Sequence, residues 1–117
     1  MHSVPSRGDV FLAALDPTRG SEQAGTRPVI IVSRDAINQN SSVVICIPCT
    51  DAANCRRIYP SQALFRKGTA GLPLDSVAMC EQVRAIAIAR LKTRIGKLDR
   101  RSQGIIDDKL KIALDLD

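Results

Sequence analysis

The chain has 117 residues, of which 44% are hydrophobic, and it carries a formal net charge of +5 at pH 7. This length suits one domain with one modest core, and the hydrophobic content argues against a disordered chain. No apolar run approaches the roughly 20 residues of a membrane-spanning helix, and 1–6 lack the apolar core of a signal peptide. We therefore expect a single cytoplasmic domain, 1–117, with a flexible tail at 1–6 and no membrane contact.

The positive charge is unevenly distributed along the chain. The excess of Lys and Arg lies before residue 102, whereas 102–117 hold more acidic than basic residues. A basic body suits nucleic acid or an acidic protein partner, and a solvated Arg-rich surface explains the same charge equally well. Because only Phe11, Tyr59 and Phe65 are aromatic, phosphate contacts and base-edge hydrogen bonds would have to dominate any RNA binding.

The first half of the chain predicts three strands. Apolar and β-branched residues place them at 9–15, 27–33 and 42–50. The polar stretch 34–40 is expected to form one short helical turn. Because the third strand is apolar on both faces, it should lie deep in the sheet.

The second half predicts shorter elements. A short fourth strand is expected at 56–59, and the longest strand at 76–88. A turn of helix is expected at 89–94, followed by a short last strand at 95–98.

A helix is predicted at the C-terminus. Asp99 is a good N-cap, and Ile106, Leu110 and Ala113 fall on one helical face. Short strands followed by one helix predict a mostly β domain that forms a small, closed, mainly antiparallel barrel.

The most informative segment is 20–32. Gly20 and Gly25 bound a loop and permit backbone angles that side chains disfavour. Pro28 fixes the exit from this loop and biases Arg27 toward an extended conformation. Four β-branched residues follow, so Arg27 is expected at the junction of a loop and a rigid sheet.

Three further sequence motifs accompany this segment elsewhere in the chain. Arg-Gly-Asp-Val-Phe stands at 7–11, Ile-Pro-Cys-Thr at 47–50, and 75–84 ends in Glu-Gln-Val-Arg. In this order the blocks resemble the MazF/PemK family of toxin-antitoxin endoribonucleases, over nearly the whole chain. The resemblance implies an SH3-like barrel of the CcdB/PemK type, a homodimer and an acidic cognate antitoxin. It also implies sequence-specific cleavage of single-stranded mRNA, leaving 2′,3′-cyclic phosphate and 5′-hydroxyl ends.

RNA makes such chemistry possible with few catalytic groups, because its 2′-hydroxyl can attack the neighbouring phosphate. The protein must then hold the backbone in line and stabilise charge on the phosphate. The resemblance assigns these catalytic tasks to Arg27 and Thr50. Since a guanidinium stays protonated in proteins, we expect Arg27 to be an electrostatic clamp, and proton transfer is left open.

Further residues are expected to contact RNA. Gln82 would read a base edge and Arg84 would bind a phosphate, although solvated strand edges and loops explain these residues as well. Neighbouring residues of a regular strand point to opposite faces, so Glu81 and Gln82 can both reach RNA only if the strand ends or bulges there. The full set is Glu22, Gln23, Arg56, Arg57, Glu81, Gln82 and Arg84.

No metal site or cofactor is expected. The sole histidine, His2, lies in the tail, and no acidic cluster has metal-binding spacing. Cys46 and Cys49 form a C-x-x-C match, with Cys55 and Cys80 elsewhere. At a separation of three, strand side chains point to opposite faces, so buried free thiols are favoured over a zinc or redox site.

Two rival functions remain open. CcdB-like toxins share the implied fold but inhibit DNA gyrase as binding proteins, without nuclease activity. The second rival is a catalytically inactive homologue that only binds antitoxin. The presence of Arg27 and Thr50 favours the nuclease.

Overall fold

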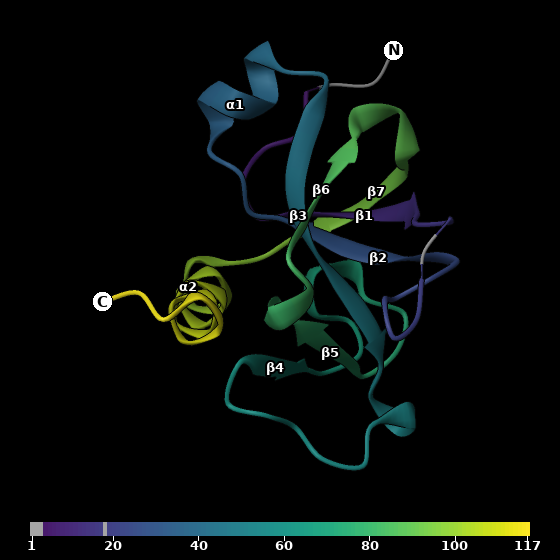
Figure 1. Ribbon diagram of the computed structural model, residues 1–117, viewed down its shortest axis with the longest axis vertical. Coiled ribbons are helices and arrows are strands. Elements are labelled where there is room, and N and C mark those ends of the chain that lie inside the picture. The colour runs from purple at the N-terminus through teal and green to yellow at the C-terminus, as the bar shows by residue number, and fades with distance from the viewer. Residues whose placement is uncertain (1–3, 18) are drawn as a thin grey trace.

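The computed structural model describes residues 4–17 and 19–117 (Figure 1). The first half of the expected tail, 1–3, which includes His2, lies outside this described part. The described residues form one seven-stranded sheet and two α-helices. The strands are β1 (Asp9–Ala14), β2 (Thr26–Ile31), β3 (Val43–Asp51), β4 (Gln62–Phe65), β5 (Ser76–Met79), β6 (Arg84–Ala87) and β7 (Leu91–Lys97). The helices are α1 (Asp35–Asn40) and α2 (Arg100–Leu114).

Short 3-10 turns connect several of these elements. They are η1 (Ala52–Asn54), η2 (Thr69–Gly71), η3 (Cys80–Gln82) and η4 (Ile88–Arg90). The strand order is β4-β5-β3-β2-β1-β7, with β6 also paired to β3, and every pairing is antiparallel. Because β3 pairs with three strands, it lies at the centre of the sheet, as its apolar sequence predicts.

The long strand predicted at 76–88 is interrupted. Both β5 and β6 pair with β3, Ala78 opposite Cys49 and Arg84 opposite Cys46. Six positions separate Ala78 from Arg84, whereas three separate Cys46 from Cys49, so three residues leave the ladder. These are the residues of η3, which form a bulge-like break in the middle of the strand.

Side chains on the two faces of the sheet form two cores. Val29 and Ile31 belong to one cluster with Phe11 and Cys46, whereas Ile30 belongs to the other. This alternation is the period of two expected for a strand buried on both faces.

Helix α2 covers the second of these cores. Ile106, which is 2% exposed, is buried in the cluster that contains Ile30, with Ile105, Leu110 and Ala113 packed around it. The predicted apolar face of this helix is therefore confirmed. Neither helix of the described part of the chain has the length and apolarity required to cross a membrane.

The predicted cap of α2 is also present. The side chain of Asp99 accepts a hydrogen bond from the backbone N–H of Ser102 at 2.7 Å. This bond lowers the pKa of Asp99 from its ordinary value, because it stabilises the carboxylate form.

Two predicted elements are wrong. No strand forms at 56–59: these four residues are exposed and pair with no described strand. The fourth strand lies instead at Gln62–Phe65, where buried side chains pack and the backbone pairs with β5. The helical turn expected at 89–94 covers only Ile88–Arg90, and β7 begins at Leu91 because its backbone pairs with β1.

The fold class, mostly antiparallel β with a C-terminal helix, is confirmed. Among the described residues, however, no backbone ladder joins β4 to β7 and closes the barrel. Turn η2 packs against β7 instead, where a Cβ on Gly71 would overlap the carbonyl of Ile95. Gly71 also has a φ of +77°, so glycine is required there on both grounds.

Candidate active site

Arg27 and Thr50 meet across the β2–β3 pair. Val29 lies opposite Pro48 in the antiparallel register, so Arg27, two positions before Val29, and Thr50, two positions after Pro48, lie on that same face. Nη1 of Arg27 donates to Oγ1 of Thr50 at 3.4 Å, and Nε of Arg27 donates to the carbonyl of Ala24 at 2.6 Å. Thr50 is 7% exposed, which confines its hydroxyl to this crevice. The structure thus brings together the two residues predicted to be catalytic, whose role stays a prediction.

The loop before Arg27 is fastened at its base. The backbone N–H of Leu15 donates to the carbonyl of Gly25 at 3.0 Å, and the N–H of Gly25 donates to Oδ1 of Asp16 at 3.1 Å. Gly20 and Gly25 have φ values of +58° and +76°. The left-handed backbone that the two glycines predict is therefore present.

Arg90 bonds the backbone where the loop begins, a contact that the sequence does not predict. Its Nη1 donates to the carbonyl of Asp16 at 2.6 Å and to that of Ala14 at 3.3 Å. These acceptors lie 74 and 76 positions away in the chain. Because backbone carbonyls carry no sequence signature, only the folded structure identifies this contact.

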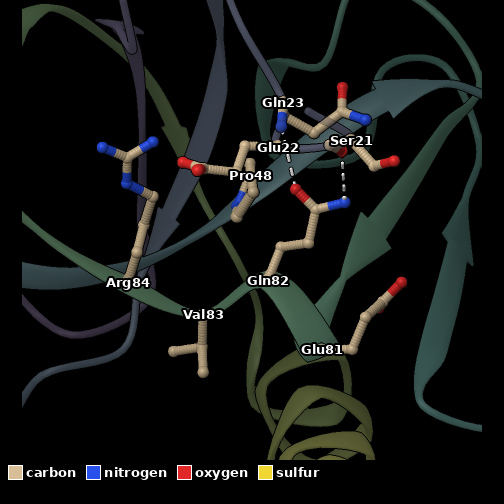
Figure 2. A pocket seen from close by; sticks show the side chains of 8 residues that line it. All are labelled: Ser21, Glu22, Gln23, Pro48, Glu81, Gln82, Val83 and Arg84. Carbon is tan, nitrogen blue, oxygen red and sulfur yellow. Dashed lines mark hydrogen bonds between the residues drawn. The ribbon is translucent and has the colours of Figure 1, made fainter. Parts of the chain in front are cut away.

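A pocket of about 500 Å³ lies between this loop, β3 and η3 (Figure 2). Pro48 contributes to its wall and lies two positions before Thr50 in β3, on the same strand face. Arg27 and Thr50 are not lining residues, but the shared face of β3 leads from the pocket to them. The lining residues are Ser21, Glu22, Gln23, Pro48, Glu81, Gln82, Val83 and Arg84.

Five of the seven predicted RNA contacts line this pocket. Glu22 and Gln23 come from the loop, and Glu81, Gln82 and Arg84 come from η3 and the start of β6. The break at η3 is what allows Glu81 and Gln82 to line the same cavity, which a regular strand would prevent. From the sequence, Glu81 and Gln82 can both reach RNA only if the strand ends or bulges here, and the strand does break at this point.

The two η3 side chains have different partners. Oε1 of Gln82 accepts from the backbone N–H of Gln23 at 2.9 Å, and its Nε2 donates to the carbonyl of Ser21 at 3.4 Å. Figure 2 shows both bonds running from Gln82 to the loop. Oε2 of Glu81 instead accepts from Nε2 of Gln62 at 2.6 Å, which connects η3 to β4.

Arg84 brings positive charge to the pocket. Its Nη1 is buried and has no hydrogen-bond partner among the described residues. In Figure 2 the Glu22 carboxylate extends toward the side of the pocket occupied by the Arg84 guanidinium. A buried donor without a partner is energetically costly, so an acceptor that entered this pocket would find a free binding group.

Arg56 and Arg57 lie outside the pocket. Both are exposed in the segment between η1 and β4, and the Arg57 guanidinium lies 4.9 Å from the centroid of the Tyr59 ring. This distance is typical of a cation–π contact. The structure therefore does not gather these two arginines with the other predicted RNA contacts.

The cysteines behave as small apolar residues. Cys46, Cys49 and Cys80 are free and buried, and burial raises the pKa of each thiol to about 12. Cys46 and Cys49 belong to different cores, which confirms that they point to opposite faces of β3. Within the described ranges, no three His, Cys, Asp or Glu side chains are grouped closely enough to hold a metal ion.

Solved structures with the same fold include a MazF protein and an endoribonuclease. A MazF structure from Deinococcus radiodurans matches with a TM-score of 0.83 at 21% identity, covering 98% of this chain and all of that one. An endoribonuclease from a mycobacterial species, solved in complex with its cognate antitoxin, matches with a TM-score of 0.79 at 23% identity, covering 97% of each chain. At these identities the likeness shows the fold alone.

Sequence relatives give the family. The chain is 37% identical over 115 residues to the endoribonuclease MazF9 of Mycobacterium tuberculosis, covering 94% of this chain and 96% of that protein. It is 40% identical over 110 residues to the endoribonuclease MazF of Staphylococcus epidermidis, covering 94% of this chain and 91% of that protein. Residues 6–114 match the family model described as the PemK-like, MazF-like toxin of type II toxin-antitoxin systems. The chain therefore belongs to the PemK/MazF toxin family.

Proposed function

We propose that this protein is a sequence-specific, metal-independent endoribonuclease that cleaves single-stranded mRNA as the toxin of a type II toxin-antitoxin system. The observation that carries this proposal is the contact between Nη1 of Arg27 and Oγ1 of Thr50, 3.4 Å apart beside a polar pocket. Relatives at 37% and 40% identity that are named endoribonucleases support it.

The proposed reaction uses the nucleophile of the substrate. The 2′-oxygen attacks the adjacent phosphorus and loses its proton, while the bond from phosphorus to the 5′-oxygen breaks and that oxygen gains a proton. The products are a 2′,3′-cyclic phosphate and a 5′-hydroxyl. Arg27 would stabilise the negative charge on the non-bridging oxygens, and the Thr50 hydroxyl would bond a phosphoryl oxygen or the 2′-oxygen.

The pocket beside this pair would hold the flanking nucleotides. Nη1 of Arg84, buried and without a described partner, is suited to a phosphate oxygen. Glu22 and Gln23 would contact bases from the loop side, and Glu81 and Gln82 would form the η3 side of the RNA site. Exposed Arg56 and Arg57 would contact phosphates beyond the pocket.

We also propose an acidic antitoxin and a second copy of this chain as partners, all in the cytoplasm. The basic body of the chain supports the first, as does the relative solved with its cognate antitoxin. For the second, an apolar face is exposed on the β3–β6 pair, where Val43 (41% exposed) lies opposite Ala87 and Ile45 (36% exposed) lies opposite Ala85. Sedimentation of the wild type and an Ile45→Lys variant would test the dimer.

A defined transcript tests the proposed activity. Purified wild-type protein should cut a long RNA at a few sites that primer extension maps, with EDTA present or absent. An oligomer whose 2′-hydroxyl is replaced by hydrogen at the cut site should resist cleavage. Poisoned gyrase with intact RNA would support the CcdB-like alternative, and antitoxin binding with neither effect would support the inactive homologue.

A further inference from the structure

The tip of the glycine-bounded loop is held from outside by one side chain. Gln82 bonds the backbone of Gln23 and Ser21 at 2.9 and 3.4 Å, across 59 and 61 positions of the chain. Among the described residues, the backbone of 21–23 has one other hydrogen bond, a local one in which the N–H of Glu22 donates to the carbonyl of Arg19 at 3.2 Å. Asp16 holds the base of the loop at Gly25, whose N–H belongs to the same peptide unit as the Ala24 carbonyl, and Arg90 in turn bonds the carbonyl of Asp16.

The tip of the loop is adjacent to the backbone carbonyl that bonds Arg27. Ala24 follows Gln23 directly, and its carbonyl accepts from Nε of Arg27 at 2.6 Å. Nη1 of the same guanidinium reaches Thr50 at 3.4 Å. The guanidinium therefore has two fixed partners, and the carbonyl partner belongs to the loop.

We propose that Gln82 is a positioning residue whose amide latches this loop, and that the latched loop aligns Arg27 with Thr50 through the carbonyl of Ala24. The kinetic consequence rests on the proposed nuclease function, whereas the latch itself does not. Without Gln82, a loop with glycine at both ends would gain conformational freedom, and the Ala24 carbonyl, then held only through Gly25, would fix Arg27 less firmly.

This role differs from reading a base. Both polar atoms of the Gln82 amide are already engaged by the loop, and its Nε2 also lies 3.8 Å from Sδ of Met79. A base that bound the second lone pair of Oε1 or the second N–H of Nε2 would have to share the amide with the loop. The two roles therefore predict different effects of the same substitution.

Amide hydrogen exchange measured by NMR tests the latch without any RNA. In Gln82→Ala, the amide of Gln23 should exchange about fivefold faster, because one hydrogen bond contributes about 1 kcal/mol. The amide of Gly25, held by Asp16, is an internal reference. In Gln82→Glu, which keeps an acceptor for Gln23, most of the protection should return.

Glu81→Ala is the matched control on the same turn. It removes the bond to Gln62 and leaves both loop bonds intact, so the Gln23 amide should exchange as in the wild type. Unchanged amide exchange in α2 would show that each variant is folded. Unchanged exchange of Gln23 in folded Gln82→Ala would overturn the latch, whether or not the protein cuts RNA.

Single-turnover cleavage tests the alignment of Arg27. Gln82→Ala should lower the cleavage rate about tenfold to a hundredfold, as small misplacements of catalytic groups do, with the order of preferred RNA sites unchanged. Gln82→Glu should recover much of this loss. An altered site preference at an unchanged maximal rate would identify Gln82 as a base reader and overturn the proposal. A wild-type protein that leaves RNA intact would refute the proposed function and leave the latch to be judged by exchange.

Discussion

Arg27 and Thr50 lie 23 positions apart in the chain, yet the register of β2 and β3 brings Nη1 of one within 3.4 Å of Oγ1 of the other. The arginine supplies a planar cation and the threonine a nearly buried hydroxyl. Both come from sheet strands at the edge of a polar pocket. Such a pair can stabilise charge on a phosphate without a metal ion, and the predictions below follow from this geometry.

Replacing Arg27 by lysine should abolish most cleavage although the positive charge is retained. Lysine lacks the planar fork that bonds the Ala24 carbonyl and Thr50 at once. We expect the single-turnover rate to fall by about 10² to 10³. Arg94→Lys is the matched control, because Arg94 pairs with Asp9 and not with this site. A wild-type rate in folded Arg27→Lys would contradict the clamp.

Two substitutions at Thr50 separate its hydroxyl from its shape. Thr50→Val keeps the branched volume and removes the hydroxyl, so we expect cleavage to fall roughly tenfold or more. Thr50→Ser keeps the hydroxyl and should retain most activity. The comparison is made at saturating RNA, with thermal unfolding as the check on folding. If valine is tolerated and serine is not, packing rather than hydrogen bonding defines the role of this residue.

Arg84→Met should weaken RNA binding and reduce its dependence on salt. One phosphate contact fewer lowers the slope of log K against log salt by about 0.7 for a single strand. Fluorescence anisotropy with an uncleavable deoxy-substituted oligomer, measured at several salt concentrations, gives this slope. Lys92→Met on β7 is the control, because Lys92 is exposed and is not a lining residue of the pocket. An unaltered slope in Arg84→Met would exclude a phosphate contact.

The cysteines should react at very different rates. Since burial raises the pKa of Cys46, Cys49 and Cys80 to about 12, the thiolate fraction at pH 8 is on the order of 1 in 10,000 for each. Half-buried Cys55 should therefore be the one thiol that a disulfide reagent modifies quickly. Cys55→Ser should remove the fast phase. Rapid modification of several thiols in the folded protein would contradict this prediction.

Burial of α2 gives a prediction for stability. Ile106 is 2% exposed and Ile112, on the same helix, is 53% exposed. Ile106→Ala should lower the free energy of unfolding by about 2–5 kcal/mol, whereas Ile112→Ala should change it by less than about 0.5 kcal/mol. Urea titrations at fixed protein concentration measure both. Equal losses would mean that the exposed face of α2 is covered in solution.

The sequence predicts most of the framework because the relevant signals are local. Strands β1, β2 and β3 lie within one or two residues of their predicted bounds, and Asp99 caps α2 as expected. The sequence predicts a continuous strand at 76–88, because it has no glycine or proline at the position of the break. Only pairing with β3 reveals that three residues leave the ladder.

The candidate site is predictable in part for a similar reason. The glycine loop and Arg-Pro junction identify Arg27, and Thr50 follows from the family resemblance. The contacts of Gln82 with the loop and of Arg90 with two carbonyls span 59 to 76 positions. Their acceptors and donors on the loop are backbone groups that every residue type carries, so no pattern of side chains indicates them.

Turn η3 fastens the loop on one side and β4 on the other, through two successive side chains. A substitution at Glu81 would change the β4 side of the pocket, whereas a substitution at Gln82 would change the loop and, through the loop, the setting of Arg27. In the proposed nuclease, one short turn would thus couple the shape of the RNA pocket to the alignment of the proposed catalytic pair.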